Sequence, residues 1–268
     1  MKDITQLFDT EPNARCLFIG SGISGADAAA HRADPAWFDK HYDVVLVPNQ
    51  GYEPYIETAD ATKHTRWYSF IIETSVVRFD WFYKIPMTFT RILHEKNKEW
   101  LIKVNGRWTD STEREIAHAY TNAAYGATRN KYELRQFNPR SAGYDTGLIS
   151  GDVDDINHAK GTVLLQGMHF AALLGASSLD IVGCELCFAK GVQHYFEEGE
   201  PFAKAENTFP QWFTYVKLNG ELAKTHKHFS NSAEYLDECY PRFLKAGMRI
   251  TRCCDSLIKR IPRGELPQ

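Results

Sequence analysis

A glycine-rich turn after an apolar run carries the clearest chemical signal in the sequence. Residues 17–19 lead into Gly20-Ser21-Gly22, and a third glycine follows at position 25. Glycines at this spacing allow a tight turn, let a ligand approach backbone N–H groups, and let the next helix pack on the strand. A helix starting near Ser24 would favour an anion at its N-terminus. The turn predicts a phosphate-bearing ligand, with a ligand-free structural turn as the alternative.

The next apolar run, residues 42–47, shows which ligand this turn serves. It ends in Pro48-Asn49-Gln50, where a dinucleotide-binding protein would carry an Asp or Glu for the ribose hydroxyl. The amide of Asn49 both donates and accepts hydrogen bonds, which suits a nucleobase or sugar edge. We therefore rank an NAD or FAD oxidoreductase last among the possible functions.

Further along the chain, two helix–strand units predict the sheet that positions these residues. Residues 161–175 form a buried helix closed by glycine, and residues 179–183 a short buried strand. Residues 232–246 form an amphipathic helix ending at Gly247, and residues 248–253 a strand. This order predicts a doubly wound α/β fold with a mostly parallel, Rossmann-like sheet. We expect one domain over residues 1–268.

The middle of the chain is rich in aromatic residues and irregular. We interpret residues 51–110 as a packed excursion from the sheet whose aromatic residues belong to a core, or alternatively form a wall for an acceptor sugar. A capped helix is expected over residues 112–124, followed by a polar loop to Gly151. Residues 186–228 are interpreted as a lid-like insertion.

Composition narrows the class of partner. The chain has 268 residues and a formal charge of −3, so nothing in the net charge suggests nucleic-acid binding. The sequence shows no secretory signal and no apolar run long enough for a membrane span, and we expect a cytoplasmic location. The oligomeric state is left open, a homo-oligomer included.

Two groups of residues in the sequence could bind a metal, and neither pattern favours one. Cys184 and Cys187 form a CxxC pair that Cys253-Cys254 could complete as a zinc site, but adjacent cysteines in a strand face opposite sides. The six cysteines instead suggest reduced thiols. The acidic run containing Asp152, Asp154 and Asp155 favours a turn and helix cap over a cation site, although a metal-dependent transferase stays possible.

Taken in order, these segments resemble the bacterial sialyltransferases of glycosyltransferase family 42 and the related DUF115 or MptE-like proteins. The resemblance rests on the Gly20-Ser21-Gly22 turn, the strand-end Asn49-Gln50, residues 175–185, and residues 228–232 before the last long helix. It covers residues 14–50 and 160–258, and it implies a variant of the GT-A fold with an inserted lid. The family's Asn between the two glycines is Ser21 here.

The resemblance implies a CMP-activated acidic sugar as substrate, no metal or other cofactor, and a glycan or lipid-linked acceptor. Carried over, Gly20, Ser21, Gly22 and Asn49 contact the nucleotide, and His228 removes the acceptor's proton, with His226 as its substitute. The remaining positions implied at the site are Gln50, Gly161, Thr162 and Gly183 around the donor, Tyr195 at the phosphate, and Glu185 at a hydroxyl.

Histidine suits the task of a base because its ordinary pKa lies near neutrality. The mechanism therefore requires His228 to face the rim of the sheet. Two alternatives remain: an MptE-like diphosphokinase using ATP and magnesium, and a noncatalytic nucleotide- or glycan-binding module. The basic, partly apolar tail over residues 257–263 is a candidate for peripheral contact with the inner face of a membrane, with ordinary solvation as the alternative.

Overall fold

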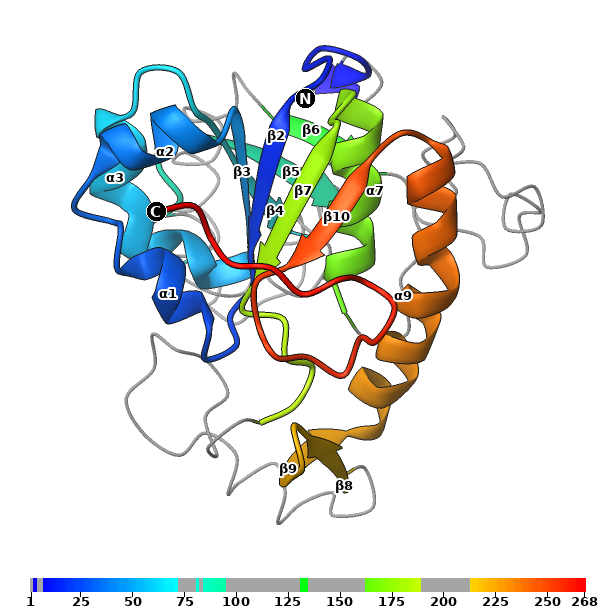
Figure 1. Ribbon diagram of the computed structural model, residues 1–268. Coiled ribbons are helices and arrows are strands. Elements are labelled where there is room, and N and C mark those ends of the chain that lie inside the picture. The colour runs from blue at the N-terminus through cyan, green and yellow to red at the C-terminus, as the bar shows by residue number, and fades with distance from the viewer. Residues whose placement is uncertain are drawn as a thin grey trace, which may run out of the picture.

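A parallel β-sheet forms the centre of the protein. The computed structural model describes residues 2–3, 7–71, 81, 84–94, 131–134, 162–188 and 213–268. Within these, eight strands pair in parallel in the order β1-β6-β5-β4-β3-β2-β7-β10 (Figure 1). The strands are β1 Lys2–Asp3, β2 Arg15–Ile19, β3 Val44–Pro48, β4 Arg66–Ile71, β5 Phe89–His94, β6 Lys131–Leu134, β7 Ser178–Val182 and β10 Arg249–Arg252.

Helices cover both faces of this sheet, so the protein has three layers (Figure 1). Helices α7 (Leu164–Leu174) and α9 (Lys227–Lys245) pack on one face. The other face carries α1 (Gly25–Ala29), α2 (Pro35–His41), the 3₁₀ helix η2 (Asn49–Tyr55) and α3 (Ile56–Ala61). The prediction of an α/β fold with a mostly parallel sheet is confirmed.

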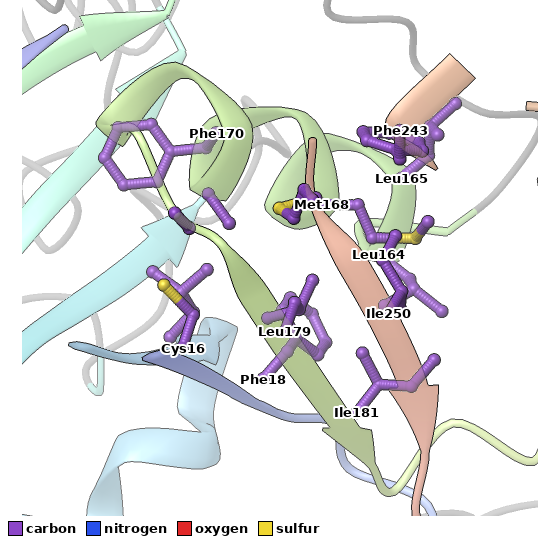
Figure 2. Close-up of a cluster of buried hydrophobic side chains, with 14 of the residues drawn as sticks. Cys16, Phe18, Leu164, Leu165, Met168, Phe170, Leu179, Ile181, Phe243 and Ile250 are labelled. Atoms are coloured by element: carbon purple, nitrogen blue, oxygen red, sulfur yellow. The ribbon is translucent and has the colours of Figure 1, made fainter. Parts of the chain in front are cut away.

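The core beneath α7 shows why this helix is apolar on nearly every side. Ten of its eleven residues are buried, because the helix lies between β2, β7, β10 and α9 (Figure 2). Gly167 lets α7 approach β2, since a Cβ there would overlap the ring of Phe18. The helix ends at Gly175, whose φ of 95° is a conformation that glycine adopts without strain.

The aromatic segment from residue 51 is part of the main sheet and its covering layer, and not the excursion from the sheet that the sequence predicted. Its described part supplies η2, α3 and two strands of the main sheet, β4 and β5. Tyr52, Tyr55, Trp67 and Tyr68 are all buried. They belong to the core, as one of the two interpretations held, and they do not present their rings to an acceptor sugar. The aromatic residues at 79, 82, 83 and 108 lie outside the described residues, as does the helix expected over residues 112–124.

A hairpin and the C-terminal tail lie at the carboxyl end of the sheet. Strands β8 (Phe213–Leu218) and β9 (Glu221–His226) form a separate antiparallel hairpin, which lies beyond the carboxyl ends of β7 and β10 (Figure 1). Helix α9 begins at Lys227, five residues before the predicted start, and returns to β10. The tail then passes from the α9 side to α2, where the Trp37 indole N–H donates to the Pro267 carbonyl at 3.1 Å.

Candidate functional site

The strand order reverses at β2, and the predicted site residues gather there. From β2 the chain continues to β3 on one side, whereas β7, on the other side, is reached only later. Open parallel sheets bind ligands beyond the carboxyl ends of the strands at such a reversal. The residues that follow β2, β3 and β7 are residues 20–22, 49–50 and 183–185, so neighbouring strands bring all three segments to one edge.

The glycines of the first turn are required by close packing of the chain on itself. The Gly20 N–H donates to the Val182 carbonyl at 2.7 Å, and the Gly22 N–H to the Gly183 carbonyl at 2.9 Å. A Cβ on Gly20 would overlap the Gly183 carbonyl, and one on Gly183 would overlap the Gly20 carbonyl. Gly183 also has a φ of 69°. The loops after β2 and β7 therefore contact each other directly, backbone against backbone.

Glu185 occupies the position where the turn was expected to receive a ligand's anion. Its carboxylate Oε1 accepts the Ser24 N–H at 2.7 Å, and a Cβ on Gly22 would overlap Oε2. The Ser24 hydroxyl is also engaged, because it accepts the Gly183 N–H at 2.8 Å. The Ser24 N–H at the start of α1 therefore already has an acceptor within the protein.

The Glu185 carboxylate is itself incompletely satisfied. The residue is 2% exposed, and Oε2 has no hydrogen-bond partner among the described residues. Burial raises the pKa of this carboxyl, while the hydrogen bonds from Ser24 act to lower it. A buried acceptor without a partner costs free energy, so a hydrogen-bond donor that reached Oε2 would be stabilising.

Asn49 offers a second unsatisfied acceptor at the same edge. It begins η2 directly after β3 with a φ of 49°, a left-handed conformation that asparagine tolerates better than most residues. Its Oδ1 is buried and accepts no hydrogen bond from any part of the chain that the structure describes. Gln50 differs, because its amide donates to the exposed Glu53 carboxylate at 3.1 Å. Asn49 is thus the better placed of the two predicted contacts.

The N-terminus of α7 lies at the same end of the sheet. Since α7 leads into the start of β7, the helix runs antiparallel to the strands and begins near their carboxyl ends. The Thr162 hydroxyl accepts the Leu164 N–H at 3.2 Å. Gly161 lies outside the described residues, as do Tyr195 and the aspartates at 152, 154 and 155.

His228 lies in the first turn of α9, although the position of its side chain is not described. Helix α9 leads into β10, so its N-terminus lies at the carboxyl end of the sheet (Figure 1). The strand before it is tied to the loop after β7, because the Thr225 hydroxyl donates to the Leu186 carbonyl at 2.7 Å. His226, the alternative base, has its ring 5.4 Å from that of Phe213.

All six cysteines are free and buried, as predicted for reduced thiols. Burial raises the pKa of Cys187 to about 12 and that of Cys254 to about 11, so these thiols are protonated at neutral pH. Within the described ranges, no group of three His, Cys, Asp or Glu residues is arranged to hold a metal ion. The zinc interpretation is therefore not supported for these cysteines.

Sequence reasoning missed a buried polar pair on neighbouring strands. Ser69 of β4 and Arg91 of β5 are register partners, 0% and 2% exposed. Neither Ser69 Oγ nor Arg91 Nη1 has a hydrogen-bond partner in the described part of the protein. Burial lowers the pKa of Arg91 to about 10. The signal in the sequence was an arginine inside the apolar run 89–93.

Comparison with known proteins identifies no relative. No family model matches the chain, and neither a curated protein nor a solved structure is detectably similar to it. Among the helices that the structure describes, none is long and apolar enough to cross a membrane.

Proposed function

We propose that this protein is a glycosyltransferase that moves an acidic sugar from a CMP-linked donor to a hydroxyl of a glycan or lipid-linked acceptor, on a Rossmann-like sheet. The donor lies over the carboxyl ends of β2, β3 and β7. The strand order supports this proposal, since its reversal at β2 creates the kind of edge at which nucleotides bind.

The observation that carries the proposal is a pair of buried acceptor atoms without partners at this edge, Asn49 Oδ1 and Glu185 Oε2. A nucleoside supplies the matching donors, which are the ribose hydroxyls and the amino group of cytosine. Because both protein atoms accept hydrogen bonds, they fit the nucleoside half of CMP better than its phosphate. The nucleoside therefore lies over residues 49 and 185.

The phosphate requires donors from elsewhere, since Glu185 holds the Ser24 N–H. Thr162 at the start of α7 is one candidate, and the phenol of Tyr195 is the other. Hydrogen bonds from these groups would stabilise the departing phosphate as negative charge develops on it. The resemblance implies the phosphate contact for Tyr195, and for Thr162 it implies only a place near the donor.

The transfer itself needs a base for the acceptor. His228, in the first turn of α9, would take the proton from the acceptor hydroxyl. The acceptor oxygen then forms a bond to the anomeric carbon of the donor sugar, while the bond from that carbon to the CMP oxygen breaks with its electron pair. CMP leaves with the second negative charge on its phosphate, and attack opposite the leaving group inverts the anomeric configuration.

Calorimetric titration with CMP tests the nucleoside contacts. We expect Asn49→Ala and Glu185→Gln each to weaken CMP binding by about tenfold, because each loses one buried hydrogen bond or its charge assistance. Glu53→Gln is the matched control, since Glu53 is exposed on the same 3₁₀ helix. No binding of CMP, together with tight binding of another nucleotide, would contradict the proposal. ATP binding that requires magnesium would favour a diphosphokinase.

Release of CMP from a CMP-linked nonulosonic acid tests the base. His228→Ala is expected to lower the rate of transfer by a factor of about 100 or more while leaving CMP affinity unchanged. His226→Ala is the matched control two residues away. If His226→Ala loses transfer and His228→Ala does not, the base is His226. If neither variant changes the rate, the proposed mechanism is wrong.

A further inference from the structure

One face of the β8–β9 hairpin combines cationic with apolar side chains. The strand register pairs Tyr215 with Lys224 and Lys217 with Leu222, so all four side chains share a face. Tyr215 is 65% exposed and Leu222 is 72% exposed. They are two of the four large exposed hydrophobic residues in the described part of the chain. Lys217 lies between them on the same surface and is also exposed.

The opposite face of the hairpin is the one turned toward the protein. Ala223 and Thr225 are buried there, and the Thr225 hydroxyl donates to the Leu186 carbonyl. Asn219 and Gly220 form the connecting turn with φ angles of 52° and 89°, which matches the tight turn that fixes hairpin register. The face with Tyr215 and Leu222 is thus held outward in a defined register.

The side chains of this outward face suit one kind of partner. Phe213 and His226, at one end of the face, pack against the rings of Phe188 and Phe229. The exposed part is Tyr215, Lys217 and Leu222, with Lys224 beside them, and none of these side chains is acidic. An exposed aliphatic side chain gains more free energy in the acyl boundary of a bilayer than against the largely polar surface of a sugar. Lysines beside it attract anionic headgroups, and tyrosine is enriched at such interfaces. We propose that this face docks onto an anionic lipid surface.

The C-terminal tail is less suited to this role than its sequence suggested. Ile258 and Ile261 are 0% exposed and belong to the core, so the tail offers cations without an apolar anchor. The hairpin offers both. It also lies at the carboxyl end of the sheet (Figure 1). The inference does not depend on the proposed function, because it requires no ligand at the site.

Vesicle flotation with the full chain tests the inference. We expect the protein to float with vesicles of phosphatidylcholine and phosphatidylglycerol but not with phosphatidylcholine alone, and to detach in high salt. Leu222→Ser should reduce the bound fraction about tenfold, and Lys217→Glu about fivefold or more. Leu244→Ser is the matched control, since Leu244 is 45% exposed on α9, away from the hairpin.

Three outcomes would overturn the proposal that the hairpin face docks onto lipid. The first is no binding to the anionic vesicles, and the second is an equal loss of vesicle binding with Leu244→Ser. The third is a loss of vesicle binding with Arg260→Glu in the tail while both hairpin variants bind normally. Hairpin variants that float normally but raise the apparent KM for a glycan acceptor would assign the face to a glycan instead. Thermal unfolding of each variant verifies that it is folded.

Discussion

Replacing Gly22 with alanine tests whether Glu185 fills the glycine turn. An added Cβ would overlap Glu185 Oε2 and would lie 2.9 Å from the Gly183 carbonyl oxygen. The Glu185 carboxylate cannot move aside without a loss of free energy. It is 2% exposed, and moving it breaks the 2.7 Å hydrogen bond from the Ser24 N–H. Position 22 therefore requires glycine because Glu185, far along the chain, packs against it.

The expected loss follows from these contacts. A buried hydrogen bond to a charged group contributes about 1.5–3 kcal/mol, and crowding against the Gly183 carbonyl adds about 1 kcal/mol. We expect Gly22→Ala to lower the free energy of unfolding by about 3 kcal/mol, and Tm by about 6–12 °C for a chain of this size. Gly51→Ala is the control, because a Cβ on Gly51 meets its nearest atoms only at 3.9 Å.

A double-mutant cycle then isolates the contact. In a Glu185→Ala background the overlap with the carboxylate is gone, so Gly22→Ala should cost only about 1 kcal/mol, an interaction energy of about 2 kcal/mol. Urea unfolding with unchanged m-values is the measurement. An equal cost of Gly22→Ala in both backgrounds would refute the assignment of Glu185 to the turn.

Three further predictions concern stability. Asp39 accepts the N–H groups of residues 63–65; although burial alone would raise its pKa, these hydrogen bonds lower it to about 2, so Asp39→Ala should cost about 2 kcal/mol at neutral pH. That difference should shrink in urea titrations as pH falls from 4 toward 2. Burial raises the pKa of Glu185 above its ordinary value of 4.5. The preference of the folded state for the protonated carboxyl stabilises the protein below pH 4.5, and this contribution is lost as pH rises through the raised pKa. Glu185→Gln should therefore gain stability relative to the native protein above about pH 4.5 in the same assay. Ile261→Ala should cost about 2–5 kcal/mol by urea unfolding, because the side chain is fully buried, and a loss below about 0.5 kcal/mol would contradict docking of the tail.

The units α7–β7 and α9–β10 were predictable because each joins a periodic or apolar run to a glycine that closes the helix. Gly175 and Gly247 both have positive φ angles, and the strands start within a residue of the predicted positions. Strands β4 and β5 were missed. Both of their faces are buried, so β4 lacks the alternation that marks a half-exposed strand, and its aromatic residues suggested an excursion.

The edge of the site was predictable for a topological reason, and its internal contacts were not. Residues that follow neighbouring parallel strands must share an edge, so Gly20, Asn49 and Glu185 come together once the strand order is known. The hydrogen bond between Ser24 and Glu185 spans 161 positions in the sequence. No local pattern encodes a pairing of that range, since it depends on how two loops meet after the sheet has formed.

A glycine-rich turn after a strand can therefore arise for two physical reasons, and the sequence alone does not show which group fills the turn. In a phosphate-binding turn the missing Cβ atoms make room for a ligand, whereas here they make room for Gly183 and Glu185. Among the described residues, two buried acceptors lack a partner beside the turn: Glu185 Oε2 after β7, one strand to one side, and Asn49 Oδ1 after β3, one strand to the other side. A nucleotide at this edge would then be held by its sugar and base, and its phosphate would point toward the start of α7.

That orientation predicts that cytidine retains most of the affinity of CMP for the native protein. Calorimetric titration with cytidine and with CMP tests this prediction. If cytidine fails to bind while CMP binds tightly, the phosphate dominates and Glu185 does not contact the ribose.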